Sequence, residues 1–214
     1  CGRQVGRIED DQASDHRLPI GREEWACDLH RPVLRFDEGQ VFRILDLGVG
    51  SGAILLAILA ERPGAKGLGV DISEEALAVA RDNAAGLGLA GRLALLRSDW
   101  TAGLAEEEFD LVVSNPPYIA TEVIETLDPE VRLHEPRLAL DGGPDGLDAY
   151  RLLAPEILRV LKPGGIFAVE IGYDQKDAVE ALFRQAGALN VVTIRDLSDR
   201  DRVVTGIRNP LEMP

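Results

Sequence analysis

The chain has 214 residues, of which 45% are hydrophobic and 28% are charged, and this composition is typical of globular proteins rather than of disordered ones. Its formal net charge of −14 at pH 7, from 23 Lys and Arg against 37 Asp and Glu, excludes a broad basic surface for binding nucleic acid. Two cysteines and three widely separated histidines give neither a disulfide framework nor the spacing of a metal site.

Residues 1–40 mix charges, glycine and proline and show no sustained helical or strand period, so we expect an irregular lead-in there. They contain no apolar signal segment. The longest purely apolar run of the chain, Ala53–Ala60, is far shorter than the roughly 20 residues that span a bilayer. We therefore expect a protein of the reducing cytoplasm, with no metal and no membrane partner.

From residue 41 onward, short apolar runs alternate with longer amphipathic ones. This alternation predicts an α/β fold with a mostly parallel, seven-stranded sheet and helices on both faces. The last two strands lack an intervening helix and are expected to pair as an antiparallel hairpin at the sheet edge. The expected strands are 43–47, 66–70, 93–96, 109–113, 166–171, 191–194 and 202–207. The expected helices are 53–61, 74–85, 147–161 and 176–186. Ser73 is the expected cap of the second helix, and the third is expected to bend near Pro155. Residues 115–144 are expected to form a long loop with a helical turn, and 162–165 a turn.

The segment Asp46–Gly52 (DLGVGSG) closes the first strand and opens the first helix. Its glycines let the backbone turn sharply and approach a ligand, and the helix N-terminus offers unpaired N–H groups. The spacing is Gly-x-Gly-x-Gly rather than the Gly-x-Gly-x-x-Gly of dinucleotide loops, and Asp46 would face a cation. This combination favours S-adenosylmethionine (SAM), whose methionine moiety carries an ammonium and a sulfonium. The alternative is a tight strand–helix connection without a ligand.

Asp71 ends the second strand, where its carboxylate could accept hydrogen bonds from both hydroxyls of a bound ribose. Asp99 and Trp100 follow the third strand and suggest an adenine pocket; alternatively, Trp100 packs at the edge of the core. The residues expected to bind the cofactor are Asp46, Gly48, Val49, Gly50, Ser51, Gly52, Asp71, Ile72, Asp99, Trp100 and Asn115.

The most informative stretch is Asn115-Pro116-Pro117-Tyr118, which follows the fourth strand. Adjacent prolines remove two N–H groups and fix the backbone, which leaves carbonyl oxygens as acceptors beside the Asn115 side chain. Two convergent acceptors and the flat ring of Tyr118 suit a planar NH₂ group, whose delocalised lone pair makes it a poor nucleophile. Catalysis would then rest on orientation and electrostatics rather than on a strong base. The alternative is a rigid proline turn with Asn115 as a strand-end cap.

Together with Ser98-Asp99-Trp100, Glu135-Pro136, Gly142–Gly146 and Asp201-Arg202, these motifs resemble the HemK/PrmC family of protein glutamine N5-methyltransferases over about residues 43–208. The resemblance implies a Rossmann-like SAM methyltransferase fold, with SAM along Gly48–Gly52, its ribose on Asp71 and its adenine near Trp100. It assigns Asn115, Pro116 and Tyr118 to catalysis, and these residues together with Pro117 to substrate binding.

The family methylates the glutamine of the Gly-Gly-Gln motif in peptide chain release factors, or in one branch a ribosomal-protein glutamine. By this resemblance residues 41–214 form the catalytic domain, and residues 1–40 are the remnant of, or the linker from, an N-terminal substrate-binding domain. Residues 1–40 lack the family's helical N-terminal domain and its Pro-Arg-Pro-Glu-type segment, and Val49 stands where threonine is common.

Two other functions remain open from the sequence. The same chemistry could act on an exocyclic amine of RNA or DNA, although residues 120–130 hold no basic residue and the next are Arg132 and Arg137. The chain could also be a non-catalytic SAM-fold interaction module, which the intact Asp46, Asp71 and Asn115 argue against.

Overall fold

A computed structural model describes residues 41–127 and 136–211. The chain divides into two compact units, residues 1–36 and residues 37–214, and only the second falls within the described part. The irregular lead-in expected at 1–40 and the position of Glu135 therefore lie outside the described residues.

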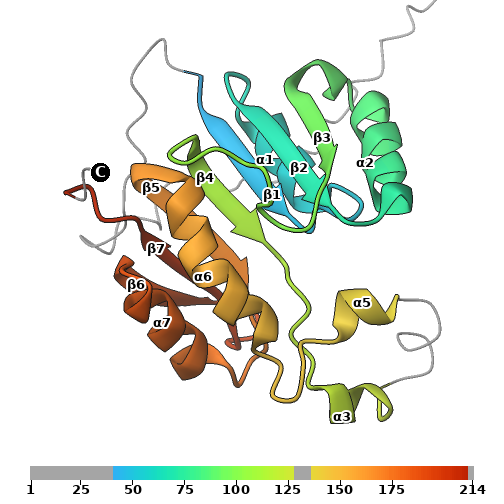
Figure 1. Cartoon of the computed structure of the whole chain (residues 1–214). Helices are drawn as coiled ribbons and strands as arrows, with labels where there is room; N and C mark the ends of the chain where they lie inside the picture. Colours follow the sequence, from blue (N-terminus) through green and yellow to red (C-terminus); the bar gives the residue numbers. More distant parts are fainter. Residues whose placement is uncertain (1–40, 128–135, 212–214) are drawn as a thin grey trace, which may run out of the picture. The chain divides into compact units, whose positions relative to one another are not determined.

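The second unit contains one seven-stranded sheet, in the order β3-β2-β1-β4-β5-β7-β6 (Figure 1). The strands β1 to β5 run parallel, β7 pairs antiparallel with β5, and β6 pairs antiparallel with β7. This confirms the predicted mixed sheet with its antiparallel C-terminal hairpin. The strands are β1 (Arg43–Leu47), β2 (Lys66–Asp71), β3 (Leu93–Arg97), β4 (Phe109–Ser114), β5 (Leu161–Glu170), β6 (Leu189–Arg195) and β7 (Asp201–Ile207).

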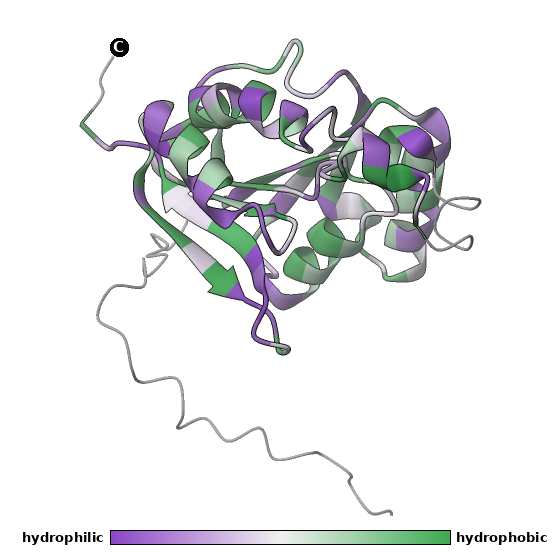
Figure 2. Ribbon diagram, turned by 90° about the horizontal axis from the view of Figure 1, so that it is seen from below, coloured by the Kyte–Doolittle hydropathy of each residue, from purple (hydrophilic) through white to green (hydrophobic). Residues whose placement is uncertain are grey.

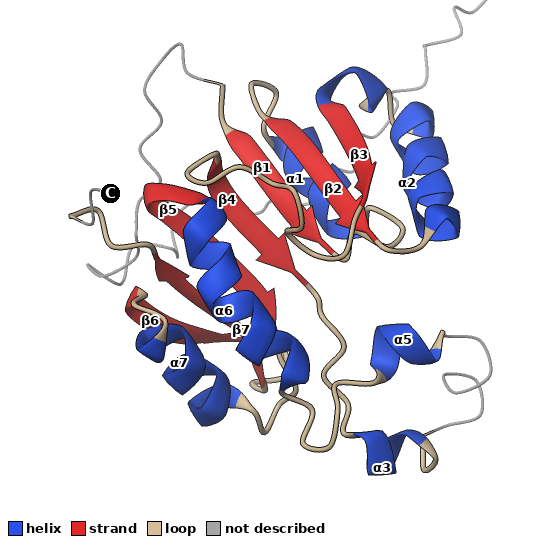
Figure 3. Ribbon diagram, viewed as in Figure 1, coloured by secondary structure: helices blue, strands red, loops and turns tan. Residues whose placement is uncertain are grey.

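Helices cover both faces of the sheet, with α6 and α7 in front of it in the view of Figure 3 and α1 behind. The side chains of β1 alternate between two cores, because successive residues of a strand point to opposite faces. Ile44 packs with α1 and α2, whereas Leu45 and Leu47 pack with α6 and α7. Within the described residues the helices are α1 (Ala53–Glu61), α2 (Glu74–Gly86), α3 (Thr121–Ile124), α5 (Arg137–Leu140), α6 (Asp148–Val160) and α7 (Lys176–Gln185), with a 3₁₀ turn η1 (Ala90–Arg92).

The helices α6 and α7 are amphipathic, whereas α1 is apolar along almost its whole length. Figure 2 shows helices that carry both hydrophobic and hydrophilic residues. Phe167 of β5 and Phe183 of α7 stack with their ring centroids 4.1 Å apart in the front core. Ser73 caps α2 as predicted, because its hydroxyl accepts the N–H of Ala76 at 3.1 Å. In the described part of the chain, no helix has the length and apolar character needed to cross a membrane.

Two elements differ from the sequence prediction. The residues 162–165, predicted as a turn, belong to β5, where a register shift opposes Phe109 to Leu161 and Leu111 to Ile166. The predicted helix 147–161 is confirmed as α6, which includes Pro155 and is one residue shorter at each end. The loop after β4 contains two short helices, α3 and α5, where one helical turn was expected.

Candidate functional site

The site lies where the strand order of the sheet reverses, between β1 and β4. Connections leave these two neighbouring strands on opposite sides, and open α/β sheets bind ligands in the resulting crevice at the carboxyl ends of the strands. Leu47 ends β1 and is paired with Ser114, which ends β4. The buried Ser114 hydroxyl donates to the Leu47 carbonyl at 2.7 Å, so the loops that follow the two strands start from one fixed point.

The glycine-rich loop after β1 is held by hydrogen bonds to β2 and to α2. The N–H groups of Gly48 and Val49 both donate to the Val70 carbonyl at 2.9 Å, and Asn83 of α2 donates to the Ser51 carbonyl at 2.9 Å. The Val49 side chain is buried, so it packs under the loop. At Gly50, whose φ is 52°, a Cβ atom would meet no atom within 4 Å. The loop therefore faces open space at its centre, where a ligand can approach the backbone.

Asp71 reaches this loop from the end of β2, as predicted, but it is already hydrogen-bonded. Its carboxylate accepts the N–H of Gly50 and the N–H of Ser73, each at 2.9 Å. Because each carboxylate oxygen has two lone pairs, both can still accept a ribose hydroxyl. The next residue, Ile72, is 47% exposed beside it and offers an apolar contact.

Asp46 shows whether the residues present fit a cationic ligand. Its side chain is only 2% exposed, and its Oδ1 atom has no hydrogen-bond partner among the described residues. Burial raises the pKa of Asp46 to about 7; the backbone N–H of Leu55 opposes this shift, and the charge of Asp71 adds to it. A buried carboxylate oxygen without a donor is costly, and a ligand cation supplies what it lacks. The residues present therefore fit the ammonium group of SAM.

Trp100 lies between the glycine loop and the core. Its indole Cζ3 is 3.6 Å from where a Cβ of Gly48 would stand, and the half-buried ring also packs against the front core. This contact agrees with the alternative interpretation of Trp100 as a residue at the core edge, and it places the indole at the loop as well. The φ of Trp100 is 49°, a left-handed conformation that is uncommon outside glycine. Asp99 is exposed.

The loop after β4 carries the residues that the sequence predicts as acceptors. Asn115 is exposed, whereas Pro116 is buried and Pro117 and Tyr118 are half-buried. Within the described residues, no backbone N–H donates to the carbonyl oxygen of Asn115 or Pro116, while the Tyr118 carbonyl accepts from Gln175. The two free carbonyls and the Asn115 amide thus stand at the end of β4, next to the strand that carries Asp46.

The Tyr118 side chain is not simply an apolar platform. Its ring packs against the front core, and its hydroxyl donates to the Glu170 carboxylate at 3.3 Å. Burial and the Glu170 charge raise the pKa of Tyr118, and Arg202 opposes this shift. Arg202 of β7 lies 3.8 Å from the same Glu170 oxygen. Sequence reasoning missed Glu170, although an acidic residue at the end of the strand next to β4 is a usable signal.

Gln175, at the start of α7, was also missed. Its side chain bonds to the loops that follow β4 and β5 and to the loop that precedes α6. Its position after Gly172 gave no sign of this role, because all its partners are backbone groups.

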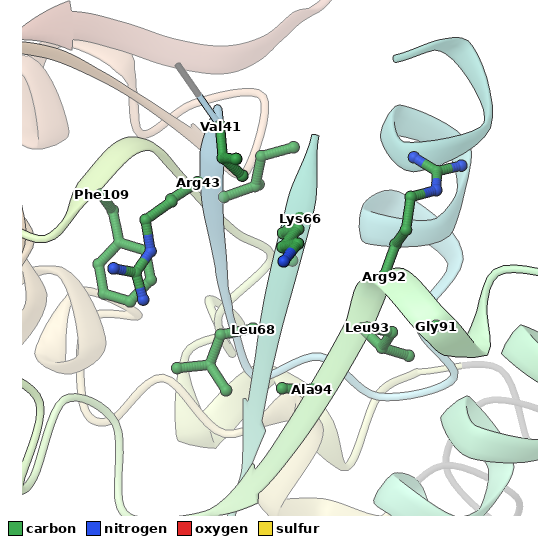
Figure 4. Close-up of a pocket in the computed structure, with 11 residues that line it drawn as sticks. Val41, Arg43, Lys66, Leu68, Gly91, Arg92, Leu93, Ala94 and Phe109 are labelled. Carbon is green, nitrogen blue, oxygen red and sulfur yellow. The ribbon is translucent and has the colours of Figure 1, made fainter. Parts of the chain in front are cut away.

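A separate cavity of about 460 Å³ lies at the opposite edge of the sheet (Figure 4). It is lined by Arg43, Lys66 and Leu93, the first residues of β1, β2 and β3. Arg43 is paired with Glu108, and its guanidinium lies 5.9 Å from the ring centroid of Phe109. This cavity is at the amino ends of the strands and shares no residue with the site. Across 41–127 and 136–211, no group of three or more His, Cys, Asp or Glu side chains is arranged to hold a metal ion.

The family of methyltransferase domains matches residues 40–199 of the chain. The curated relatives include the release factor glutamine methyltransferase of Caulobacter vibrioides, which is 74% identical over 84% of this chain and 62% of its own length. That of Cereibacter sphaeroides is 52% identical over 76% of this chain and 58% of its own length. A third, from Moorella thermoacetica, is 48% identical over 88% of this chain and 67% of its own length. The chain thus spans about three fifths of the length of the first two relatives.

Solved structures show the same fold at low sequence identity. A methyltransferase from Pyrococcus furiosus has a TM-score of 0.58 at 19% identity, over 79% of this chain and 76% of its own. A ribosomal protein L11 methylase from Lactobacillus delbrueckii subsp. bulgaricus has a TM-score of 0.55 at 24% identity, over 80% of this chain and 72% of its own. These two likenesses establish the fold class.

Proposed function

Because the chain belongs to the methyltransferase-domain family and, within it, to the HemK/PrmC family, we propose that it methylates the side-chain amide nitrogen of a protein glutamine. The substrate proposed is the Gly-Gly-Gln motif of a peptide chain release factor, since the curated relatives are named for that activity. The cofactor proposed is SAM, and the product is S-adenosylhomocysteine. The proposal extends to this chain the activity for which its longer curated relatives are named.

The observation that carries the proposal is the junction of two loops with complementary chemistry. The loop after β1 contains a buried carboxylate, Asp46, whose Oδ1 lacks a donor. The loop after β4, joined to it through Ser114 and Leu47, presents oxygen acceptors at Asn115 and Pro116. One loop suits a cationic cofactor, and the other suits the two hydrogens of an amide NH₂.

SAM, when bound, supplies an electrophilic methyl group on a positive sulfur. Asp46 would hold its ammonium, Asp71 its ribose hydroxyls, and Ile72 and Trp100 would lie near its adenine. The backbone of Gly48–Gly52 would line the remainder of the cofactor, with Asp99 at the adenine edge.

The chain's part in the chemistry is orientation. The Asn115 side-chain oxygen and the Pro116 carbonyl would each accept one amide hydrogen, which fixes the plane of the glutamine amide. As the nitrogen gains positive character its hydrogens become more acidic, so these two hydrogen bonds strengthen when they are most needed. Tyr118 and Pro117 would flank the glutamine side chain. The nitrogen loses one proton after it is alkylated, when it is acidic enough to release that proton to solvent without a strong base.

The test is transfer of a tritiated methyl group from SAM to a purified release factor. We expect incorporation that disappears when the glutamine of its Gly-Gly-Gln motif is replaced by alanine. A chain that binds SAM by calorimetry and yet labels no release factor at saturating SAM would contradict the proposed substrate. Labelling of RNA or DNA in a parallel reaction would assign the chemistry to an exocyclic amine.

A further inference from the structure

The Gln175 side chain connects three loops at the carboxyl edge of the sheet. Its Oε1 accepts the N–H of Gly172, in the loop after β5, at 3.0 Å. Its Nε2 donates to the Tyr118 carbonyl at 2.9 Å and to the Gly146 carbonyl at 3.1 Å. These partners lie in the loop after β4 and in the loop before α6, so one half-buried amide uses both its acceptor and its donors to join separate segments.

The same segments approach each other too closely for side chains. A Cβ at Gly146, whose φ is 74°, would lie 2.4 Å from the Tyr118 carbonyl oxygen and 2.6 Å from Gln175 Nε2. A Cβ at Gly142 would lie 2.9 Å from the Pro117 carbonyl oxygen. Backbone hydrogen bonds from Ile119 to the Leu140 carbonyl and from Gly142 to the Ile119 carbonyl, at 3.0 and 2.8 Å, close the contact.

The backbone carbonyl groups along the loop after β4 therefore differ in what they contact. The Tyr118 carbonyl is fixed by the Gln175 amide, and the Pro117 carbonyl lies against Gly142. The carbonyls of Asn115 and Pro116 receive no backbone hydrogen bond from the described residues. Because Pro116 and Pro117 restrict the backbone that leads to Tyr118, the fixed Tyr118 carbonyl sets the orientation of the Asn115 and Pro116 carbonyls.

We propose that Gln175 is a positioning residue for the methyl acceptor: its amide fixes the backbone of Tyr118, and through it the oxygens of Asn115 and Pro116. This inference rests on the proposed function, because it concerns the same acceptors. Gln175 does not touch the substrate or the cofactor; it acts through the Tyr118 carbonyl.

The chemistry requires an amide at this position rather than a group of the same shape. Glutamate at position 175 would keep the acceptor for Gly172 but would place a carboxylate oxygen against two carbonyl oxygens. Alanine would remove the bridge without adding repulsion. If only packing mattered, alanine would be the worse substitution, because glutamate is nearly isosteric with glutamine.

The experiment compares Gln175→Glu and Gln175→Ala with Gln185→Glu, a matched charge change at the exposed last residue of α7. We expect Gln175→Glu to lower kcat for methylation of a release factor by about 10- to 100-fold, because small displacements of reacting groups are that costly. The Kd for SAM should stay within about threefold of wild type, since the cofactor loop is not attached to Gln175. The loss in Gln175→Ala should be smaller than in Gln175→Glu, and Gln185→Glu should behave as wild type.

Gly146→Ala provides a second variant, because its Cβ displaces the Tyr118 carbonyl while Gln175 is kept. It should reproduce the kcat loss with SAM affinity unchanged. Wild-type kcat in both Gln175 variants, or a greater loss in alanine than in glutamate, would overturn the proposal.

Hydrogen exchange tests the positioning role of Gln175 separately from the proposed function. If the wild-type chain binds SAM but methylates no glutamine, the backbone N–H groups of Ile119 and Thr121 must still exchange faster in Gln175→Ala than in the wild type. Equal exchange in the two proteins would overturn the positioning role independently of the substrate.

Discussion

The Asp71 carboxylate receives the backbone N–H of Gly50 at 2.9 Å, so the end of β2 is tied to the centre of the loop after β1. The other carboxylate oxygen receives the N–H of Ser73 at the start of α2. A single acidic side chain therefore orders the proposed cofactor loop before any ligand arrives. Asp71, which the sequence predicts as the ribose acceptor, therefore also holds the backbone of the loop in place.

Asp71→Ala should weaken SAM binding and destabilise the chain at the same time. It removes the proposed ribose acceptor and leaves two backbone N–H groups without a partner, each worth about 1–3 kcal/mol. We expect the Kd for SAM to rise by at least about tenfold and the melting temperature to fall by several degrees, with kcat at saturating SAM less affected. Asp82→Ala, at an exposed site on α2, is the control for calorimetry and thermal melting. Unchanged SAM affinity in Asp71→Ala would refute the ribose assignment.

Asp46→Asn should stabilise the ligand-free chain at neutral and alkaline pH. Burial raises the pKa of Asp46 from its ordinary value of 3.8 to about 7, so between these values the folded chain binds more protons than the unfolded chain. The wild-type free energy of unfolding therefore falls as pH rises through this window. Asparagine has no such dependence, so its advantage should be absent near pH 4, grow to a few kcal/mol by pH 7, and then level off. Denaturant melts of both proteins at pH 4.5, 6 and 8 measure it, with Asp177→Asn as the exposed control.

The same substitution should impair SAM binding. Because Asp46 must lose its proton to hold an ammonium, wild-type affinity should increase from pH 6 to pH 8, and binding should release a proton near pH 7. Asp46→Asn should bind at least about tenfold more weakly at pH 8 and lose this pH dependence. Calorimetric titration with SAM in buffers of different ionisation enthalpy measures the number of protons released on binding. Equal affinity of the variant at pH 8 would show that Asp46 does not hold the cofactor.

Asn115→Ala should separate catalysis from cofactor binding. Asn115 is exposed at the end of β4, and its proposed role is to accept one hydrogen of the substrate amide. We expect kcat to fall by about 10²-fold, the loss typical of one well-placed polar contact in a transition state. The Kd for SAM should change by less than about threefold, and the melting temperature by about a degree. A variant with wild-type kcat would exclude Asn115 from the reaction.

Tyr118→Phe should have a small effect, and Tyr118→Ala a large one. The hydroxyl makes a long hydrogen bond of 3.3 Å to Glu170, whereas the ring packs against the front core. We expect less than about a threefold change in kcat for phenylalanine, and for alanine a loss of at least about tenfold in kcat with about 2 kcal/mol in stability. Methylation assays and denaturant melts of the two variants compare the hydroxyl with the ring. A large loss in Tyr118→Phe would give the hydroxyl a direct part in the chemistry.

Much of the fold follows from local patterns. The strand 43–47 and the helix 53–61 occur where the apolar runs of the sequence predict them, and Ser73 caps the next helix as its residue type indicates. The glycine loop and Asp71 meet because parallel strands bring their carboxyl ends to one edge. Such features depend on residues close in sequence or on the topology alone.

The features that sequence reasoning missed depend on distant partners. The residues 162–165 resemble a turn, but the N–H of Gly164 and the carbonyl of Gly165 pair with the backbone of Arg208, more than forty residues later. Gln175 pairs with backbone groups at positions 118, 146 and 172. Because every residue has backbone N–H or C=O groups, the sequence does not show which of them a side chain such as Gln175 will bind. The three contacts of Gln175 therefore become visible only in the structure.

The strand β7 lies inside the sheet, between β5 and β6, although the ribosome makes it after both of them. Until it emerges, β5 exposes an unpaired edge and Glu170 has no Arg202 beside it. A nascent chain thus acquires both loops of the proposed site well before it acquires the strand that completes their surroundings. The strand that completes the sheet is therefore the last of the seven to be made, and a chain stalled before β7 emerges would hold an incomplete sheet prone to pair with a neighbouring chain.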